Sequence, residues 1–195
     1  EPRRALALLQ IRGNMNKVLM ILVIPMLFLI GCGNAASQSP TVKKPINRTF
    51  EDLTLGMGEE EFKSKVFSEQ MRPGEPYLVY SPMYNSYNGN IMKEVPNVYQ
   101  VFCSFFNGKL YGISIDYSYR YRPSWDEFIY NAKQEYGKGK ENAIQKSIVW
   151  EDGKTILGIN EEFGEQMGRP VNYYSVSYID VELESQRNKQ QKQSS

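Results

Sequence analysis

The sequence predicts an α+β domain of two halves, each a helix followed by antiparallel strands, which together form a sheet covered by two helices. Three observations predict this fold. Helix starts are recognisable near residues 58 and 124. Strand-like runs flank the dipeptides Asn107-Gly108 and Asp152-Gly153, which favour tight hairpin turns. Residues 106–115 also resemble residues 151–160, which indicates that the second half repeats the plan of the first.

In the first half, Gly58 is a suitable N-cap for a helix whose first turn holds three glutamates, because acidic side chains stabilise the positive end of the helix dipole. Phe62 and Val66 share one side of this helix, which should end before Arg72. The strands predicted after it are residues 77–80, 98–106 and 109–121.

In the second half, Ser124 and Glu127 form a capping box in which each side chain bonds the backbone of the other residue. Apolar residues then recur on one helical side, and Gly137 ends the helix. The strands predicted after it are residues 147–151, 154–159 and 173–183.

The N-terminal region contains an apolar run, Val18–Ile30, that is preceded by Lys17. A bilayer-spanning helix needs roughly 20 apolar residues, so this run is typical of a secretory signal instead. Its end, Leu29-Ile30-Gly31-Cys32, resembles the lipobox of bacterial lipoproteins. That resemblance implies cleavage before Cys32 and attachment of a diacylglyceryl group to its sulfur. The alternatives are a buried helix that ends in cysteine, or an uncleaved membrane anchor.

These features divide the chain into five segments. Met15 is a natural start for the signal, so residues 1–14 are interpreted as an upstream extension, the alternative being a long charged leader. Residues 15–31 are the signal peptide, and residues 32–48 form a polar, proline-containing flexible tether. Residues 49–183 form a single α+β domain, and residues 184–195 a disordered tail, because they offer nothing apolar to bury.

Composition excludes several functions. Without residues 1–31 the chain carries 19 basic and 21 acidic side chains, which argues against nucleic acid as a partner. Histidine is absent, which removes the commonest general base and many metal sites. No pattern indicates a cofactor or metal, and we expect no catalytic residue. Cys103 lies in an apolar strand and is interpreted as a buried small hydrophobe.

Two groups of aromatic residues are candidate contact sites. One is the loop after residue 80, rich in Tyr, Asn, Ser and Gly, with Tyr84 and Tyr87. Such loops are adaptable contact surfaces in recognition proteins. The other is Tyr119, Tyr121 and Arg122, at a junction between a strand and a helix. In both places, packing at the edge of the core is the alternative. The carboxylates Asp116, Asp152, Asp180, Glu182 and Glu184 fit turns or the exterior of strands.

A second resemblance rests on Leu55-Gly56-Met57 and on the order of helix and antiparallel strands over residues 50–183. This pattern is similar to the envelope domains of BamE (SmpA) and of beta-lactamase-inhibitor proteins. We therefore expect a lipid-anchored envelope lipoprotein, in the cell membrane or outer membrane with its domain outside the cytoplasm. It should be a non-enzymatic factor that binds or assembles with an envelope protein. The alternative is an enzyme that uses carboxylates on cell-wall glycans.

Overall fold

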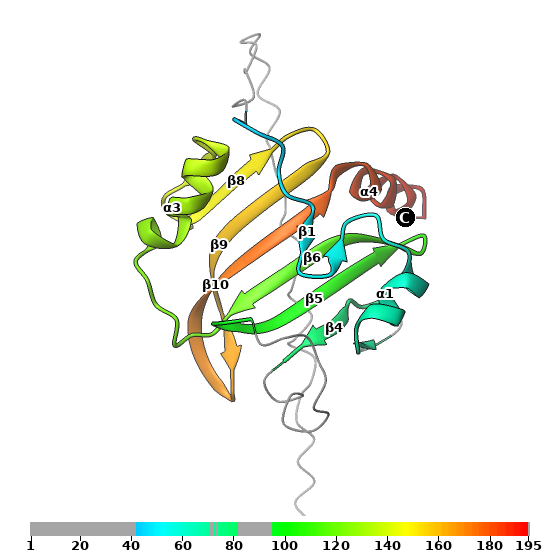
Figure 1. Ribbon diagram of the computed structural model, residues 1–195, viewed down its shortest axis with the longest axis horizontal. Coiled ribbons are helices and arrows are strands. Elements are labelled where there is room, and N and C mark those ends of the chain that lie inside the picture. Colours follow the sequence, from blue (N-terminus) through cyan, green and yellow to red (C-terminus); the bar gives the residue numbers. More distant parts are fainter. Residues whose placement is uncertain (1–41, 71, 73, 82–94, 195) are drawn as a thin grey trace, which may run out of the picture. The chain divides into compact units, whose positions relative to one another are not determined.

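The computed structural model describes residues 42–70, 72, 74–81 and 95–194. The signal, the lipobox, Tyr84 and Tyr87 lie outside the described residues. The described chain is α+β, with an eight-stranded antiparallel sheet and three helices (Figure 1). The predicted α+β class is therefore confirmed.

The elements follow one another in two series of a helix and four strands. A small separate ladder precedes them, with strands β1 (Thr49–Phe50) and β2 (Leu53–Thr54). The first series is α1 (Glu59–Lys65), β3 (Glu69–Gln70), β4 (Tyr77–Tyr80), β5 (Val98–Phe106) and β6 (Lys109–Tyr117). The second is α3 (Trp125–Tyr136), β7 (Lys140–Asn142), β8 (Ser147–Glu151), β9 (Thr155–Gln166) and β10 (Arg169–Asp180), after which α4 (Val181–Ser194) ends the described chain.

The two series join through their last strands. The order across the sheet is β3-β4-β5-β6-β10-β9-β8-β7, and every pair in it is antiparallel. Val176 of β10 lies between Ile115 of β6 and Ile159 of β9, so the centre of the core is built from both series. Each series alone forms one half of the sheet.

One face of the sheet, here called the helix face, carries the core and is covered by α1, α3 and the segment before α1. Phe62 of α1 is fully buried. The centroid of its ring lies 4.9 Å from the ring centroid of Phe105 and 5.6 Å from that of Tyr77. Ile129 of α3 is also fully buried. The sheet residues of this core include Val101, Cys103, Ile113, Ile115, Ile148, Trp150, Leu157, Ile159 and Val176.

The start of α3 is as predicted. Ser124 accepts a hydrogen bond from the backbone of Glu127, whose carboxylate accepts one from the backbone of Ser124. At the other end, Gly137 has a φ of +87°, which a side chain would strain. The hairpin turn at Asn107-Gly108 also forms, with positive φ at both residues. The local signals therefore place these elements correctly.

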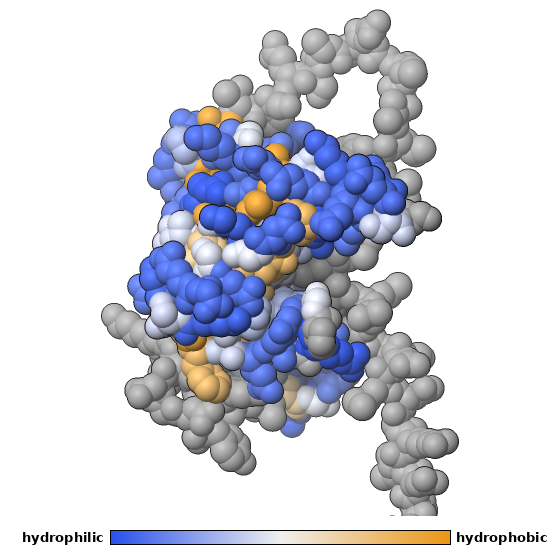
Figure 2. Space-filling model, turned by 90° about the vertical axis from the view of Figure 1, so that its right-hand side faces the viewer, coloured by the Kyte–Doolittle hydropathy of each residue, from blue (hydrophilic) through white to orange (hydrophobic). Residues whose placement is uncertain are grey.

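The opposite face of the sheet, here called the second face, carries α4 near β5, β6 and β10. Arg187 of α4 donates to the hydroxyl of Tyr111 at 2.7 Å and pairs with Glu184 at 3.0 Å. The sequence predicts a disordered tail here, and the structure instead has a helix. The side of the domain that shows α1 and α4 is mostly hydrophilic, and its apolar residues form only small separate groups (Figure 2).

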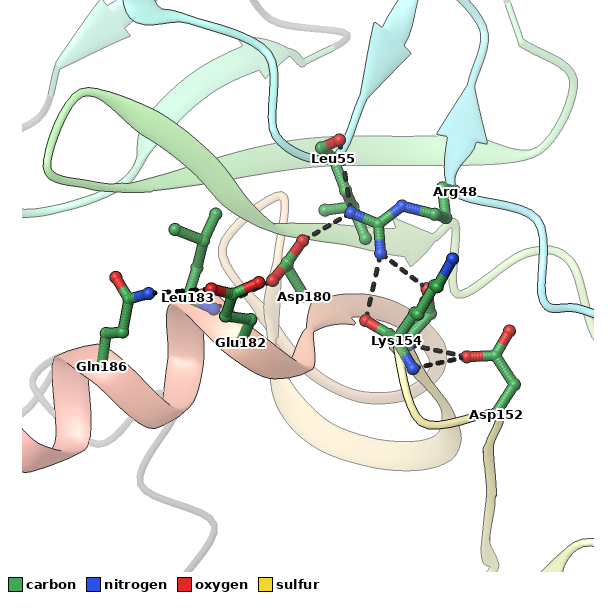
Figure 3. A network of polar contacts seen from close by, with 9 residues as sticks. Arg48, Leu55, Asp152, Lys154, Asp180, Glu182, Leu183 and Gln186 are labelled. Carbon is green, nitrogen blue, oxygen red and sulfur yellow. Dashed lines mark hydrogen bonds and ion pairs between the residues drawn. The ribbon is translucent and has the colours of Figure 1, made fainter.

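A polar network fixes the start of the domain to the start of α4 (Figure 3). The guanidinium of Arg48 donates to the carboxylate of Asp180 at 2.5 Å and to the carbonyl of Lys154 at 3.0 Å. The other oxygen of Asp180 accepts from the backbone of Leu183 at 2.9 Å and so caps α4. Asp152 accepts from the backbone of Ile46 at 2.7 Å. This network therefore ties together segments more than 100 residues apart.

Several predictions from the sequence are wrong in detail, among them the strands predicted at residues 109–121 and 154–159, which are observed at Lys109–Tyr117 and Thr155–Gln166. Asp116 and Asp180 are each only 7% exposed, although both were expected on the exterior. Their hydrogen-bond partners explain the burial, because a buried charge needs such partners. The last predicted strand, residues 173–183, ends at Asp180, since this residue caps a helix.

Candidate functional site

The connection between β6 and α3 contains the three candidate contact residues that the structure describes, Tyr119, Tyr121 and Arg122. Tyr121 is half-buried, and its ring lies 5.8 Å from that of Tyr117 and 6.2 Å from that of Phe128. Packing at the edge of the core therefore accounts for Tyr121. Tyr119 and Arg122 differ, because their contacts face solvent.

The backbone of Tyr119 is fixed by a side chain from the β9–β10 hairpin. Gln166, which is 1% exposed, accepts from the backbone N–H of Tyr119 at 2.8 Å and donates to the carbonyl of Tyr117 at 2.8 Å. The hydroxyl of Tyr99 accepts from the backbone N–H of Met167 in the same turn at 3.2 Å. The tip of the hairpin is thus held against the end of β6.

These hydrogen bonds bring together four residues that we call the arginine–tyrosine patch: Tyr119, Arg120, Arg122 and Arg169. Arg120 donates through Nε to the hydroxyl of Tyr119 at 3.3 Å, and Arg122 donates through Nε to the carbonyl of Tyr119 at 2.7 Å. Arg169 pairs with Gln166 in the ladder and so lies at the tip. The hydrogen bond from Arg120, with the charges of Arg120, Arg169 and Arg122, lowers the pKa of Tyr119.

The arginines of the patch differ from the other described arginines, because they lack a carboxylate partner. The structure describes six arginines, and Arg48, Arg72 and Arg187 each pair with a carboxylate. None of the three patch arginines forms an ion pair within the described part of the chain. The patch therefore holds three guanidinium groups that have no ion-pair partner among the described residues.

Exposed apolar side chains lie on the same hairpin. Met167, in the turn, is 58% exposed, and Phe163, on β9, is 75% exposed. Lone exposed apolar residues are normal on surfaces, but Met167 adjoins the patch, because it lies in the turn between Gln166 and Arg169. The tip therefore combines aromatic, apolar and arginine side chains.

In a comparison with known protein families, residues 48–190 match the TP0088 domain. The chain belongs to the TP0088 domain family. Searches of curated proteins and of solved structures gave no match. The matched range of the TP0088 domain runs from Arg48, in the polar network, to within α4, and it includes the whole patch.

A second polar cluster of the TP0088 domain lies on the second face, around Asp116. Gln100 donates to its carboxylate at 2.7 Å, and Ser175, its partner across the ladder, also hydrogen-bonds it. Burial raises the pKa of Asp116 and also that of Glu162, which accepts a hydrogen bond from Asn160. Asp116 therefore has its hydrogen-bonding partners within the domain.

Other chemistry of the TP0088 domain is limited. Cys103 is fully buried as predicted, and burial raises the pKa of its thiol, so it is not a reactive thiolate. Among the described residues, no group of Cys, Asp and Glu side chains could hold a metal ion. No helix in the described ranges is long and apolar enough to cross a membrane.

Sequence reasoning missed Arg120 and Arg169 as part of the patch. Arg120 has a local signal, because it alternates with two tyrosines and Arg122. Arg169 has none of this kind: it lies 47 or more residues away and joins the patch only through the hairpin turn at Met167-Gly168. Both turn residues have positive φ, which Gly168 adopts without strain and which marks this turn in retrospect.

Proposed function

We propose that this chain is a lipid-anchored envelope lipoprotein whose TP0088 domain binds or assembles with a protein partner and is not an enzyme. The arginine–tyrosine patch is the observation that carries this proposal. Tyr and Arg dominate the energetics of protein interfaces, and exposed Met and Phe are enriched there as well. Within the patch, Tyr119 and Arg122 were candidate contacts from sequence alone.

The fixed geometry of the patch supports a binding role. Gln166 satisfies two backbone groups at the end of β6, so the patch is displayed on a backbone that is already ordered. Binding to such a surface avoids part of the entropic cost of ordering a loop. The patch is therefore suited to recognition without a large rearrangement.

The proposed cellular location rests on the sequence. Leu29-Ile30-Gly31-Cys32 resembles a lipobox, and acyl chains on Cys32 would hold the domain at the outer surface of the cell membrane or at the outer membrane. The similarity to BamE and beta-lactamase-inhibitor envelope domains is consistent with this proposal, since each half of the domain is a helix followed by antiparallel strands. Fold alone does not assign function, so the patch remains the main support.

The lipid anchor is tested by Cys32→Ser. We expect that the variant no longer incorporates labelled palmitate and that it leaves the membrane fraction, because the thiol is the proposed attachment atom. Cys103→Ser is the matched control and should keep both label and membrane association. Continued labelling and membrane association of Cys32→Ser would overturn the anchor.

The binding role is tested by photo-crosslinking in intact cells. A photo-crosslinking amino acid in place of Met167 should give a discrete protein adduct, because this side chain borders the patch. The same amino acid in place of Ile144, which is 97% exposed but lies between β7 and β8, should not give that adduct. If position 167 yields no adduct, or the same adducts as position 144, the proposed function is wrong.

The alternative function, a carboxylate-dependent hydrolase acting on cell-wall glycans, has one supporting observation. Asp116 and Glu162 lie on the same face, and both have a raised pKa. A pair of catalytic carboxylates normally has pKa values that are pushed apart, whereas both are shifted upward here. Release of soluble fragments from purified cell wall, abolished by Asp116→Asn, would favour the enzyme over the binding protein.

A further inference from the structure

We propose that the arginine–tyrosine patch binds an acidic polypeptide segment of the partner, with its carboxylates held by Arg120, Arg122 and Arg169. This inference rests on the proposed binding function and deepens it. Its basis is the charge of the patch: three guanidinium groups surround one tyrosine, and none pairs with a carboxylate in the described chain. An anionic ligand would supply the carboxylates that these three side chains lack as partners.

The hydrogen bonds of the patch leave its best donors free. Arg120 and Arg122 each use Nε within the chain, at Tyr119, and their terminal nitrogens have no acceptor among the described residues. A guanidinium has five N–H donors, so each of these side chains is partly oriented while four donors still point elsewhere. Such forks fit a carboxylate with two parallel hydrogen bonds.

The surroundings of the patch favour a polypeptide over a single small anion. The ring of Tyr119 lies 5.7 Å from the guanidinium of Arg120, and Met167 is exposed in the adjoining turn. An extended acidic segment could place carboxylates on the arginines and an apolar side chain on Met167. The patch therefore offers both charge and apolar contact, as the centre of a protein interface does.

The position of the patch favours a protein over the anchoring membrane. The described chain begins beside the C-terminal end of α3, where the backbone N–H of Lys43 bonds the carbonyl of Tyr136 at 3.2 Å. The patch lies beside the N-terminal end, since Arg122 is three residues before Trp125. A helix of 12 residues is about 18 Å long. The patch is thus at the opposite end of α3 from the first described residues.

The inference is tested with the full chain in phosphatidylcholine vesicles and a fluorescent decapeptide of glutamate. We expect the glutamate peptide to bind at least about tenfold more tightly than a glutamine decapeptide. The triple variant Arg120→Gln, Arg122→Gln, Arg169→Gln should lose that preference. A triple Arg→Lys variant should bind more weakly than the wild type, because an ammonium group lacks the planar fork.

The matched control removes three positive charges elsewhere, through Lys109→Gln, Lys138→Gln and Lys140→Gln. These lysines are exposed, and the control should stay within about twofold of the wild type. Circular dichroism should show that both triple variants fold. An equal loss in both variants, or no preference for the glutamate peptide in the wild type, would overturn the inference.

Two further outcomes separate this inference from the function on which it depends. Patch-dependent binding of soluble dihexanoyl phosphatidylglycerol without peptide binding would identify a lipid headgroup as the ligand and overturn the acidic segment. If the crosslinked adduct is still formed after the Arg→Gln changes, the proposed function is retained, but the inference that the patch binds an acidic segment is wrong. An adduct lost with the arginines supports both.

Discussion

At the scale of single residues, two buried glycines, Gly139 and Gly158, should differ sharply in their tolerance of a side chain. A Cβ on Gly139 would lie 2.7 Å from Cγ1 of Ile148 and 2.9 Å from the carbonyl oxygen of Val149. A Cβ on Gly158 would meet only the rotatable hydroxyl of Ser177, at 2.9 Å. Gly139→Ala should therefore lower the free energy of unfolding by about 1–3 kcal/mol, and Gly158→Ala by less than about 1 kcal/mol.

Urea unfolding followed by circular dichroism measures both variants. Because each change adds one methyl group to the same fold, the comparison isolates the effect of a rigid neighbour against that of a movable one. Equal losses in the two variants would contradict the packing described around Ile148.

Asp116 gives a prediction about pH. Burial raises its pKa in the folded protein, so the folded state binds its proton more tightly than the unfolded chain, where the pKa is about 3.9. Its contribution to stability is then largest below that value and is lost as the pH rises through the folded pKa. We expect Asp116→Asn to gain stability relative to the wild type as the pH is raised from 4 to 7.

Urea midpoints at both pH values provide the measurement, and Asp52→Asn, at an exposed position, is the control. If the wild type instead becomes more stable relative to the Asp116→Asn variant as the pH rises, the hydrogen bonds from Gln100 and Ser175 lower the pKa of Asp116 by more than burial raises it.

At the scale of elements, α4 depends on its first turn. This helix buries none of its residues, and an isolated helix of 14 residues is marginal in water. Its support comes from Asp180, which caps it and pairs with Arg48, and from Arg187 against Tyr111. Asp180→Ala should cost about 1–3 kcal/mol, because both the cap and a partly exposed ion pair are lost.

Hydrogen exchange distinguishes this effect from a general loss of stability. In Asp180→Ala the amides of α4 should exchange faster than those of β6 and β10, whereas Asp180→Asn keeps a capping oxygen and should protect α4 better. Unchanged protection of α4 in Asp180→Ala would show that other contacts hold the helix.

The elements also show what local sequence can predict. The start of α3 and the β5–β6 turn were predictable because their signals lie within a few residues: Ser124 and Glu127 for the cap, and Asn107-Gly108 for the turn. The helix α4 was not predictable, since its sequence lacks apolar periodicity. Its capping residue, Asp180, also fits a strand, and it was included in the strand predicted at residues 173–183. The polar ends of β9 (residues 160–166) and β10 (residues 169–172) were missed for a similar reason, because Glu and Gly in the first and Pro and Asn in the second are depleted in strands.

At the scale of the whole described domain, the arrangement of the two series was only partly predictable. The repeated plan is visible in the sequence, but the pairing of β6 with β10 joins residues about 60 positions apart and has no local signal. The patch is a product of this pairing, because Gln166 and Arg169 reach Tyr119 only when β9 and β10 extend past the end of β6. Tyr119 and Arg122 could therefore be found from the sequence, whereas Arg169 could not.

We propose that the unpaired arginines of the patch hold the partner. The most direct measurement is photo-crosslinking in intact cells from position 167, with the patch intact, with Arg120, Arg122 and Arg169 changed to Gln, and with the three control lysines changed to Gln. We expect one discrete adduct that disappears only in the arginine variant. An adduct of equal yield in all three proteins, or its absence from the protein with an intact patch, would contradict the claim.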